Sequence, residues 1–395
     1  MHQKLFTLPG GLTITTYGFC LMVGFLSAVW LAMNRAKRVG ADPDRVLDAS
    51  FFALLFGVGG ARLMYVVHYW RSDFADAPNR LLAVIDIRQG GLEFLGGVLG
   101  AAVAIITFLM ITKQSVRLYL DILAPGTMWG LAFGRIGCFF NGCCFGGLCL
   151  TSGNIAEHPP WAVEFPYGSL AHVHQWEDRR VTVPAELISA GGLRASLVRA
   201  SALNMPVETR EAMTKEFRSR LKTVRTARAT NDKEQDPQQV RQWERELRET
   251  QNALDKEGLT GVLLAQKFPS RRNPQRGMSV SELEDLALGA RALAVHPTQL
   301  YSAIHALLLS AVLSTVFYRR KRHGLVIGLM FLMYPLARIP LEMVRADNPH
   351  DVGGLTVSQM ISLSSFVVAA VYLVVLYKFM PERSPAAAQA TPREE

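Results

Sequence analysis

The sequence predicts an all-α polytopic membrane protein with seven transmembrane helices and a large extracytoplasmic insert between the fourth and fifth helices. Three observations predict this fold. Half of the 395 residues are hydrophobic, and they gather into runs of roughly 18 to 22 residues, the length that crosses a bilayer's hydrocarbon core. Lys and Arg residues concentrate in alternate loops, and one long charged segment interrupts the apolar pattern. Buried helices of a large soluble protein are the alternative, but such helices rarely stay apolar on all faces for so long.

The apolar runs define the predicted spans. They cover residues 12–33, 49–69, 94–111, 121–141, 299–317, 324–340 and 357–379. The first run is too long for the apolar core of a signal peptide, and only Lys4 precedes it among the Lys and Arg residues. No cleavable signal peptide is therefore expected, and this run should remain as a transmembrane helix.

The Lys and Arg residues of the connecting segments predict the orientation, because cytoplasmic loops carry an excess of them. On one side, the loops after the first, third and fifth runs and the C-terminal tail hold Arg35, Lys37, Arg38, Arg45, Lys113, Arg117, Arg319, Arg320, Lys321, Arg322, Lys378, Arg383 and Arg393. The opposite side holds Lys4, Arg71, Arg80, Arg88 and Arg345. We expect the N-terminus outside and the C-terminus in the cytoplasm. Basic loops beside anionic headgroups account for much of the net charge of +9, so no nucleic-acid partner is expected.

The predicted domains follow from these runs. Helices 1–4 occupy residues 1–141, the extracytoplasmic insert occupies 142–295, helices 5–7 occupy 296–380, and a disordered tail occupies 381–395. The tail is short and rich in Ala, Pro and charged residues, a composition that does not build a core.

Two parts of the insert have distinct patterns. The stretch "WAVEFPYGSLAHVHQWE" mixes aromatic residues with Pro and Gly, which predicts short strands and turns. The highly charged part at about 205–257 carries two apolar stripes at helical spacing. These are Met213, Phe217, Leu221 and Val224, then Val240, Trp243, Leu247 and Leu254. They predict an antiparallel helical hairpin with a turn near Asp236–Pro237, and a partner-binding coiled coil is the alternative.

The five cysteines fall into two groups. Cys20 lies within the first predicted helix and is expected to pack as a small apolar residue. Cys138, Cys143, Cys144 and Cys149 cluster at the outer end of the fourth helix, in a compartment that permits disulfides. A disulfide among these four, whose pairing the sequence does not define, is one possibility. A zinc site is another, although adjacent cysteines are not a usual ligand spacing.

Ionisable residues inside transmembrane segments are costly and are functional candidates by default. Arg62 lies in the second predicted helix and Arg135 in the fourth. The sixth run leads into "YPLARIPLEMVR", in which Tyr334, Arg338 and Glu342 recur every four residues and so share one helical face. The alternative to a functional role is that Arg338 and Glu342 form an intrahelical salt bridge that only neutralises both charges. Two arginines that converge within a membrane favour a phosphate monoanion, because the guanidinium fork pairs with phosphate oxygens.

The glycines and the start of the fifth helix add weaker signals. The stretches "GGLEFLGGVLG" and "GRIGCFFNGCCFGG" permit close backbone approach at a site, although a helix-packing role is equally compatible. The stretch "HPTQLYSA" opens the fifth helix with Pro297 at an early position. His296 and Tyr301 could face the site from its outer rim, and a structural role for His296 at the loop is the alternative.

The ordered motifs along the chain resemble the prolipoprotein diacylglyceryl transferase family. The matching stretches are "TYGFCLMVGF", "GGARLMYV", "GGLEFLGGVLGA", "GRIGCFFNG", "HPTQLY" and "YPLARIPLEMVR". They extend over the whole set of predicted helices. The resemblance implies a multi-pass enzyme of the bacterial cytoplasmic (inner) membrane in lipoprotein biosynthesis, which needs no metal and no other cofactor.

The resemblance also implies an activity and a set of site residues. The activity is transfer of a diacylglyceryl group from phosphatidylglycerol to the lipobox cysteine thiol of prolipoproteins, with release of glycerol phosphate. The implied catalytic residues are Arg135, Arg338, Tyr17, Tyr334 and Glu342. The implied substrate-binding residues are Arg135, Gly137, Asn141, Gly146, Arg62, His296, Tyr301 and Arg345.

The chain departs from the family pattern at three positions. Leu95 stands where the third-helix motif has a histidine, Cys138 where the signature has an asparagine, and Cys143 where it has a glutamate. The insert is also larger than is usual. These departures motivate a second hypothesis, a non-catalytic or re-purposed lipid-binding relative that presents its insert to a periplasmic partner. A thiol-dependent oxidoreductase is a third, but no CxxC motif in a thioredoxin-like context supports it.

Overall fold

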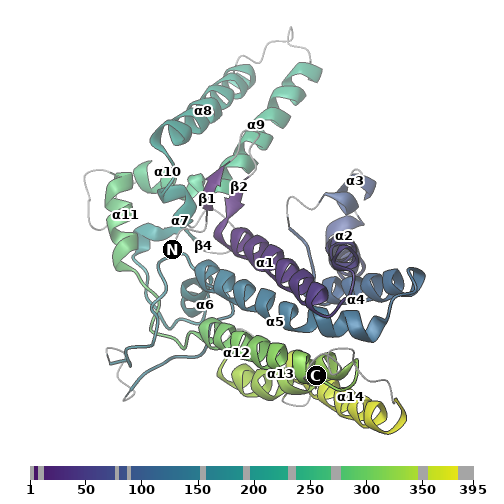
Figure 1. Cartoon of the computed structure of the whole chain (residues 1–395). Coiled ribbons are helices and arrows are strands. Elements are labelled where there is room, and N and C mark those ends of the chain that lie inside the picture. The colour runs from purple at the N-terminus through teal and green to yellow at the C-terminus, as the bar shows by residue number, and fades with distance from the viewer. Residues whose placement is uncertain are drawn as a thin grey trace. The chain divides into compact units, whose positions relative to one another are not determined.

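The computed structural model describes residues 4–7, 13–75, 80–86, 90–151, 157–189, 196–229, 237–267, 277–345 and 355–380. The chain divides into two compact units (Figure 1). We name the unit from Asn141 to Pro297 the insert unit, and the unit that combines His2–Phe140 with Thr298–Glu395 the helical unit. The predicted tail at 381–395 and most of the turn before Pro237 lie outside the described residues.

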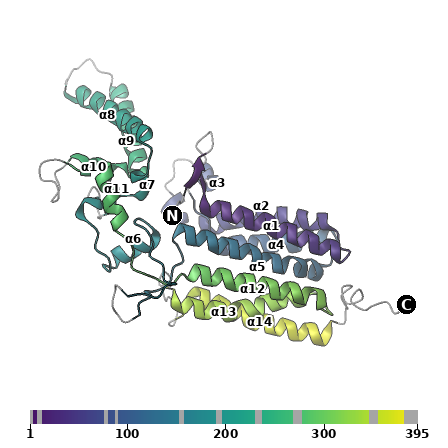
Figure 2. The ribbon, with the colours of Figure 1, turned by 60° about the vertical axis from the view of Figure 1, so that its left-hand side comes forward.

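The helical unit consists of long helices that run alongside one another (Figure 2). They are α1 (Thr16–Arg38), α2 (Pro43–His68), α4 (Phe94–Ile111), α5 (Val116–Asn141), α12 (Thr298–Arg319), α13 (Leu325–Val344) and α14 (Val357–Phe379). Shorter elements are the ribbon of β1 (Lys4–Thr7) with β2 (Thr13–Thr15), the π-helical η1 (Trp70–Phe74) and α3 (Arg80–Ile85).

Six described helices are long and apolar enough to cross a membrane, namely α1, α2, α4, α12, α13 and α14. The predicted fourth span, α5, is not among them, because Asp121, Arg135 and several glycines lower its mean hydropathy. The structure therefore confirms a predominantly helical protein with several apolar spans, and the count of seven stays a prediction.

Local sequence explains where the helices begin. The Thr15 hydroxyl accepts the Gly18 N–H at 3.1 Å at the start of α1. Asp42 accepts the Asp44 N–H at 2.9 Å before α2, where Pro43 occupies the first turn. These side chains satisfy N–H groups that have no partner within the helix. Such caps hold the helix ends in place and so fix which residues lie along each helix face.

Helices α2 and α4 touch backbone to backbone. A Cβ atom added to Gly96 would lie 2.5 Å from the Gly60 carbonyl oxygen, and one added to Gly100 would lie 2.4 Å from the Phe56 carbonyl oxygen. Only glycine allows so close an approach, and small residues are typical of contacts between membrane helices. The glycines of "GVGG" and "LGGVLG" therefore have a packing role, one of the two readings that their sequence leaves open.

The buried core of the helical unit lies between α1, α5, α12 and α13. Its members include Ala32, Tyr119, Ile122, Met128, Leu313, Phe317, Val326 and Met330. Many large apolar side chains point away from this core, including Trp30 on α1, Leu63 on α2 and Val368 on α14. An apolar exterior around a packed interior is the arrangement that a helical bundle adopts in lipid.

The insert unit is built from short elements and two longer helices. They are α6 (Leu170–Glu177), η2 (Ala185–Leu187), β3 (Ile188–Ser189), β4 (Ser196–Leu197), α7 (Ala200–Leu203), α8 (Val207–Ala229), α9 (Pro237–Glu257), α10 (Leu259–Lys267) and α11 (Val280–Gly289). Arg220 of α8 pairs with Glu246 of α9 at 3.0 Å. The unit has its own core, which includes Leu187, Val198, Leu203, Leu254, Leu259 and Leu283.

Two sequence expectations for secondary structure need correction. The part of "WAVEFPYGSLAHVHQWE" expected to form strands contains a helix, α6, because Ser169 caps it by accepting the His172 N–H at 3.2 Å. The fold is also not wholly α, since β1–β2 and β3–β4 form two small antiparallel ribbons. Neither ribbon is longer than four residues per strand, so the class stays predominantly helical.

Candidate functional site

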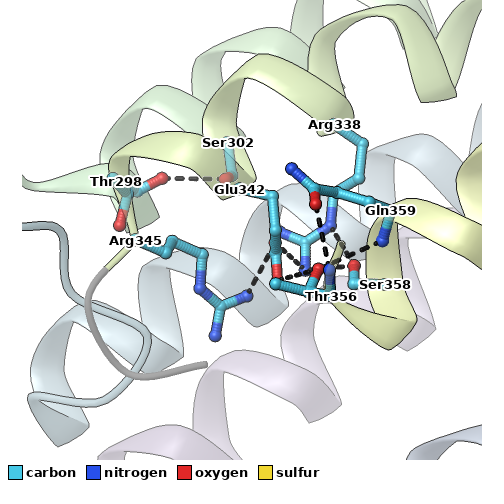
Figure 3. Close-up of polar contacts among 8 residues, drawn as sticks. All are labelled: Thr298, Ser302, Arg338, Glu342, Arg345, Thr356, Ser358 and Gln359. Atoms are coloured by element: carbon cyan, nitrogen blue, oxygen red, sulfur yellow. Dashed lines mark hydrogen bonds and ion pairs between the residues drawn. The ribbon is translucent and has the colours of Figure 1, made fainter. Parts of the chain in front are cut away.

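The acidic centre of the candidate site is Glu342 on α13, which lies between two arginines (Figure 3). Its carboxylate is 2.7 Å from Arg338 Nη2 and 3.5 Å from Arg345 Nη1. The Glu342 side chain is fully buried, and the two arginine side chains are about one tenth exposed. A buried carboxylate between two cations leaves an excess positive charge, so this cluster is suited to bind an anion.

Helix α14 supplies hydroxyl groups that hold this cluster. Ser358 Oγ accepts from both Nε and Nη2 of Arg338, at 3.1 and 2.9 Å. Thr356 Oγ1 donates to Glu342 Oε1 at 3.5 Å while it caps α14 in a capping box with Gln359. Ser358 and Glu342 thus engage Nε and Nη2 of Arg338. These contacts hold the guanidinium in one orientation beside Glu342.

Arg135 reaches the same region from α5. The guanidinium of Arg338 interacts electrostatically with Arg135, Glu342 and Arg345. That Arg135 and Arg338 meet around one phosphate stays a prediction.

A buried contact at the far ends of α5 and α13 explains this alignment. The Asp121 carboxylate of α5 accepts the backbone N–H groups of Gly324, Val326 and Ile327 at 2.8–3.0 Å, which caps the start of α13. Arg135 follows Asp121 by fourteen residues, and Arg338 follows Gly324 by fourteen residues. At a rise of 1.5 Å per residue, each arginine lies about 21 Å along its helix from this contact. The Asp121 cap therefore sets the register that places both arginines at the same level.

Tyr17 and Gly137 are also brought together. A Cβ atom on Gly137 would lie 3.0 Å from the Tyr17 ring and 3.3 Å from Cys20 Cβ. The glycine in the signature therefore lets the start of α1 pack closely on the last turns of α5. On the other side, the ring of Tyr334 lies 6.2 Å from that of His305 on α12. Both tyrosines thus come from helices that border the arginines.

Arg62 has a different environment from the one predicted for a phosphate ligand. Its Nε donates to the Val84 carbonyl at 2.8 Å, and its Nη1 and Nη2 donate to Gly90, Gly91, Ala83 and Asp86 carbonyls at 2.7–3.0 Å. A guanidinium has five N–H donors, and backbone carbonyls accept all of them here. Arg62 therefore holds the segment around α3, and a direct contact with substrate would require one of these bonds to break.

The remaining predicted residues are close in sequence to the two points where the chain passes from one unit to the other. In the insert unit, the Gly146 N–H donates to the His296 carbonyl at 2.9 Å and the His296 N–H donates to the Gly147 carbonyl at 3.0 Å. His296 thus joins the loop through its backbone, as its structural alternative requires. Asn141 is the last residue of α5, and Tyr301 is half-buried in α12. These observations leave the binding roles of these residues as predictions.

The cysteines and Leu95 show how the chain differs from the family pattern. None of the five cysteines is in a disulfide, so none of the considered disulfides is present in this structure. Cys138 and Cys149 are buried, whereas Cys143 and Cys144 are half-buried. Leu95 lies in the first turn of α4 and is 38% exposed, which suits an apolar side chain.

Comparison with known proteins places these features in a family. A profile of the prolipoprotein diacylglyceryl transferase family matches residues 3–375. Proteins named phosphatidylglycerol–prolipoprotein diacylglyceryl transferase are similar to parts of the chain. The one from Rhodopirellula baltica is 36% identical over 169 residues, which is 42% of this chain and 33% of the relative. The one from Pseudoalteromonas translucida is 35% identical over 161 residues, 40% of this chain and 56% of the relative.

A third relative, from Photobacterium profundum, is 36% identical over 179 residues, 42% of this chain and 63% of the relative. The matched segments thus span between one third and two thirds of the relatives' own lengths. The family profile, in contrast, covers almost the whole chain, including α5, α13 and α14, which carry the arginine cluster. On this evidence the chain belongs to the prolipoprotein diacylglyceryl transferase family.

Proposed function

We propose that the protein transfers a diacylglyceryl group from phosphatidylglycerol to the lipobox cysteine thiol of prolipoproteins and releases glycerol phosphate. The observation that carries this proposal is the buried Arg338–Glu342–Arg345 cluster, with Arg135 acting on Arg338 from a second helix. Membership of the family supports the choice of phosphatidylglycerol over other phosphate-bearing lipids.

The chemistry of the reaction explains why arginines are needed. The thiol sulfur forms a bond to the glyceryl carbon, and the bond from that carbon to the phosphate oxygen breaks. The leaving phosphate ester carries the electron pair of the broken bond, and the thiol proton balances that additional charge. The main electrostatic task is thus to stabilise negative charge as it develops on the phosphate, and donors that are oriented beforehand do this best. Ser358 and Glu342 orient Arg338 in that way.

The proposed roles of the site residues follow from their contacts. Arg135 and Arg338 bind and neutralise the phosphate, while Glu342 holds Arg338 and Arg345 in place. Tyr17 and Tyr334 border the arginines and orient the headgroup. These five residues act from α1, α5 and α13.

Further roles are proposed for the residues around this centre. Gly137 admits Tyr17 close to α5, and Asn141 and Gly146 complete the signature at its outer end. His296 and Tyr301 are proposed to assist in binding the substrate. Arg62 acts indirectly, because it holds the segment around α3.

The proposed topology has seven spans, with α5 as the fourth, because the buried Asp121 of α5 is neutralised by Arg320 within the helical unit. The N-terminus is outside and the C-terminus is in the cytoplasm of a bacterial inner membrane. The domains are residues 1–141, 142–295, 296–380 and 381–395, and α8 with α9 forms a helical hairpin in the insert. Single cysteines labelled from either side of oriented vesicles test this topology, and a Lys321→Cys thiol that reacts from the outside would contradict it.

The test of the activity is a lipidation assay. The purified chain is mixed with phosphatidylglycerol and a synthetic lipobox peptide, and mass spectrometry detects the thioether-linked diacylglyceryl peptide. Arg135→Gln and Arg338→Gln should each lower the rate about 100-fold or more, as loss of a donor to a developing charge typically does. Arg218→Gln is the matched control, because Arg218 lies on the exposed face of α8.

The assay also distinguishes an active transferase from a non-catalytic relative, the hypothesis that Leu95, Cys138 and Cys143 motivate. A thioether product that disappears in the Arg135→Gln variant excludes a purely lipid-binding role. If the unmodified chain forms no product beside a competent family member, the proposed activity is wrong.

A further inference from the structure

A second cationic site lies at the opposite end of the helical unit from Arg338. A cavity of about 410 Å³ is lined by Thr315, Val316, Arg319, Arg320, Lys321, Arg322, Leu325 and Tyr377. These residues come from the end of α12, the link to α13 and the end of α14. Among the described residues, no acidic side chain lines the cavity. Because two apolar helices end here, the cavity lies where the bilayer's hydrocarbon core gives way to headgroups.

One of the four cations is a buried part of the fold. The Arg320 side chain is fully buried, and its Nε is 3.1 Å from the equally buried Asp121 carboxylate. Its guanidinium also stacks over the Phe317 ring at 3.7 Å. Arg320 is therefore neutralised, and it forms a fixed floor for the cavity.

A second cation is fixed in position but keeps its charge. Arg322 Nη1 donates to the carbonyls of Leu376 and Tyr377 in the last turn of α14. Its guanidinium also lies 5.0 Å from the Tyr377 ring. The carbonyls provide partial negative charge only, and no carboxylate in the described ranges pairs with Arg322.

The remaining two cations, Arg319 and Lys321, are exposed and form no ion pair within the described parts of the chain. The cavity thus combines three uncompensated positive charges with apolar side chains at Val316, Leu325 and Tyr377. The alternative is that these cations are only a solvated loop. Such a loop does not need a cavity in which Arg320 is buried and Arg322 is held in place. A phosphate with attached acyl chains matches both the charge and the apolar lining.

We propose that this cavity binds the headgroup phosphate of an anionic glycerophospholipid in the leaflet at the cytoplasmic end of the helices. Arg319, Lys321 and Arg322 contact the phosphate, and Val316, Leu325 and Tyr377 contact the start of the acyl chains. The site is separate from the Arg135 and Arg338 cluster, since the two lie at opposite ends of α13. Its ligand has a structural role and is not consumed. Basic pockets between helices on the cytoplasmic side bind lipid headgroups in this manner.

The test uses native mass spectrometry of the full chain in neutral detergent. Dioleoyl phosphatidic acid is the anionic probe and dioleoyl phosphatidylcholine the zwitterionic one. All proteins carry Arg338→Gln, which removes a phosphate ligand from the candidate active site and keeps this test independent of the proposed function. We expect the Arg319→Gln/Lys321→Gln variant to bind phosphatidic acid about 30-fold more weakly, because each cation near an anionic surface contributes about fivefold.

The matched control is the Lys37→Gln/Lys113→Gln variant. It removes the same charge from exposed positions in other loops at the same predicted end, and it should change the affinity less than twofold. Equal weakening in both variants would mean a diffuse charge effect and would overturn the proposal, as would no weakening in either. Inorganic phosphate is added in a separate arm, and its complete displacement of the lipid would assign the cavity to a free anion instead.

Discussion

The Ser358→Ala substitution tests the orientation of Arg338 directly. The Ser358 hydroxyl accepts two N–H groups of that guanidinium at 3.1 and 2.9 Å. Hydrogen bonds to charged groups contribute about 1.5–3 kcal/mol. Arg338 keeps its 2.7 Å contact with Glu342 in the variant, so we expect the loss to fall in the lower part of that range. A loss of about 1.5–2 kcal/mol corresponds to about 13- to 30-fold in kcat/KM.

The assay is initial-rate lipidation of the lipobox peptide at varied phosphatidylglycerol concentration. If Ser358 orients Arg338 for the departing phosphate, kcat should fall more than KM rises, because the missing bond matters most when charge develops. Ser358→Thr retains the hydroxyl and should restore most of the activity. Ser362→Ala is the control, since this serine lies one turn further along α14 and is buried, whereas Ser358 is half-buried.

A double-mutant cycle separates this role from a general effect on α14. In an Arg338→Lys background, Ser358→Ala should cause little additional loss, because the fork that the hydroxyl holds is already absent. The reasoning is refuted if Ser358→Ala lowers kcat/KM less than twofold while Arg338→Gln is inactive. It is equally refuted if the effect of Ser358→Ala is undiminished in the Arg338→Lys background.

Other predictions concern packing, buried charge and pH. Gly96→Ala should strongly reduce the folded yield, because its Cβ would lie 2.5 Å from a carbonyl oxygen of α2. Gly59→Ala is the control, since a Cβ atom at Gly59 would have no atom within 4 Å and should leave the yield unchanged. Size-exclusion chromatography in detergent measures the folded yield of both variants. Asp121→Asn leaves a buried arginine uncompensated and should cost about 3–5 kcal/mol, seen as a lower Tm; an unchanged Tm would contradict the role of the cap. Arg62→Lys supplies three donors in place of five and should increase hydrogen exchange in the segment around α3, while an unchanged exchange rate there would show that the segment holds without it. Burial lowers the pKa of His172, whose two ring nitrogens have no hydrogen-bond partner in the described parts of the chain. Its contribution to stability is thus present above the unfolded pKa of about 6.5 and is lost as the pH falls below it. Limited proteolysis of the insert should speed up between pH 7.5 and 5.5, and His172→Leu should remove that dependence.

The features that could be predicted from this sequence are those marked by a periodic pattern of apolar residues or by the position of charged residues. Runs of apolar residues gave most of the helices, and the spacing of Tyr334, Arg338 and Glu342 placed them on one face of α13. Arg338 and Glu342 do form the salt bridge that the alternative to a functional role predicted, while their role in binding a phosphate stays a prediction. Arg345 joins the same carboxylate, which a simple neutralising pair does not require.

The features that escaped prediction depend on contacts between distant segments. Ser358 is an unremarkable small residue in an apolar helix, twenty positions after Arg338, and only the Thr356 capping pattern hinted that this helix end was ordered. The environment of Arg62 was equally hidden, since its partners are backbone carbonyls that carry no sequence signature. The alignment of Arg135 with Arg338 depends on Asp121, which precedes Arg135 by about 21 Å in α5.

The glycine contact between α2 and α4 restricts how a lipid can enter. Where Gly96 meets Gly60, a single added carbon would already collide with main-chain oxygen, so no hydrocarbon tail can slide between these two helices. The two helices are therefore closed to lipid at the level of these glycines. Lipid that exchanges sideways with the interior of the protein must pass elsewhere than through this contact, which needs no bulky side chain to exclude it.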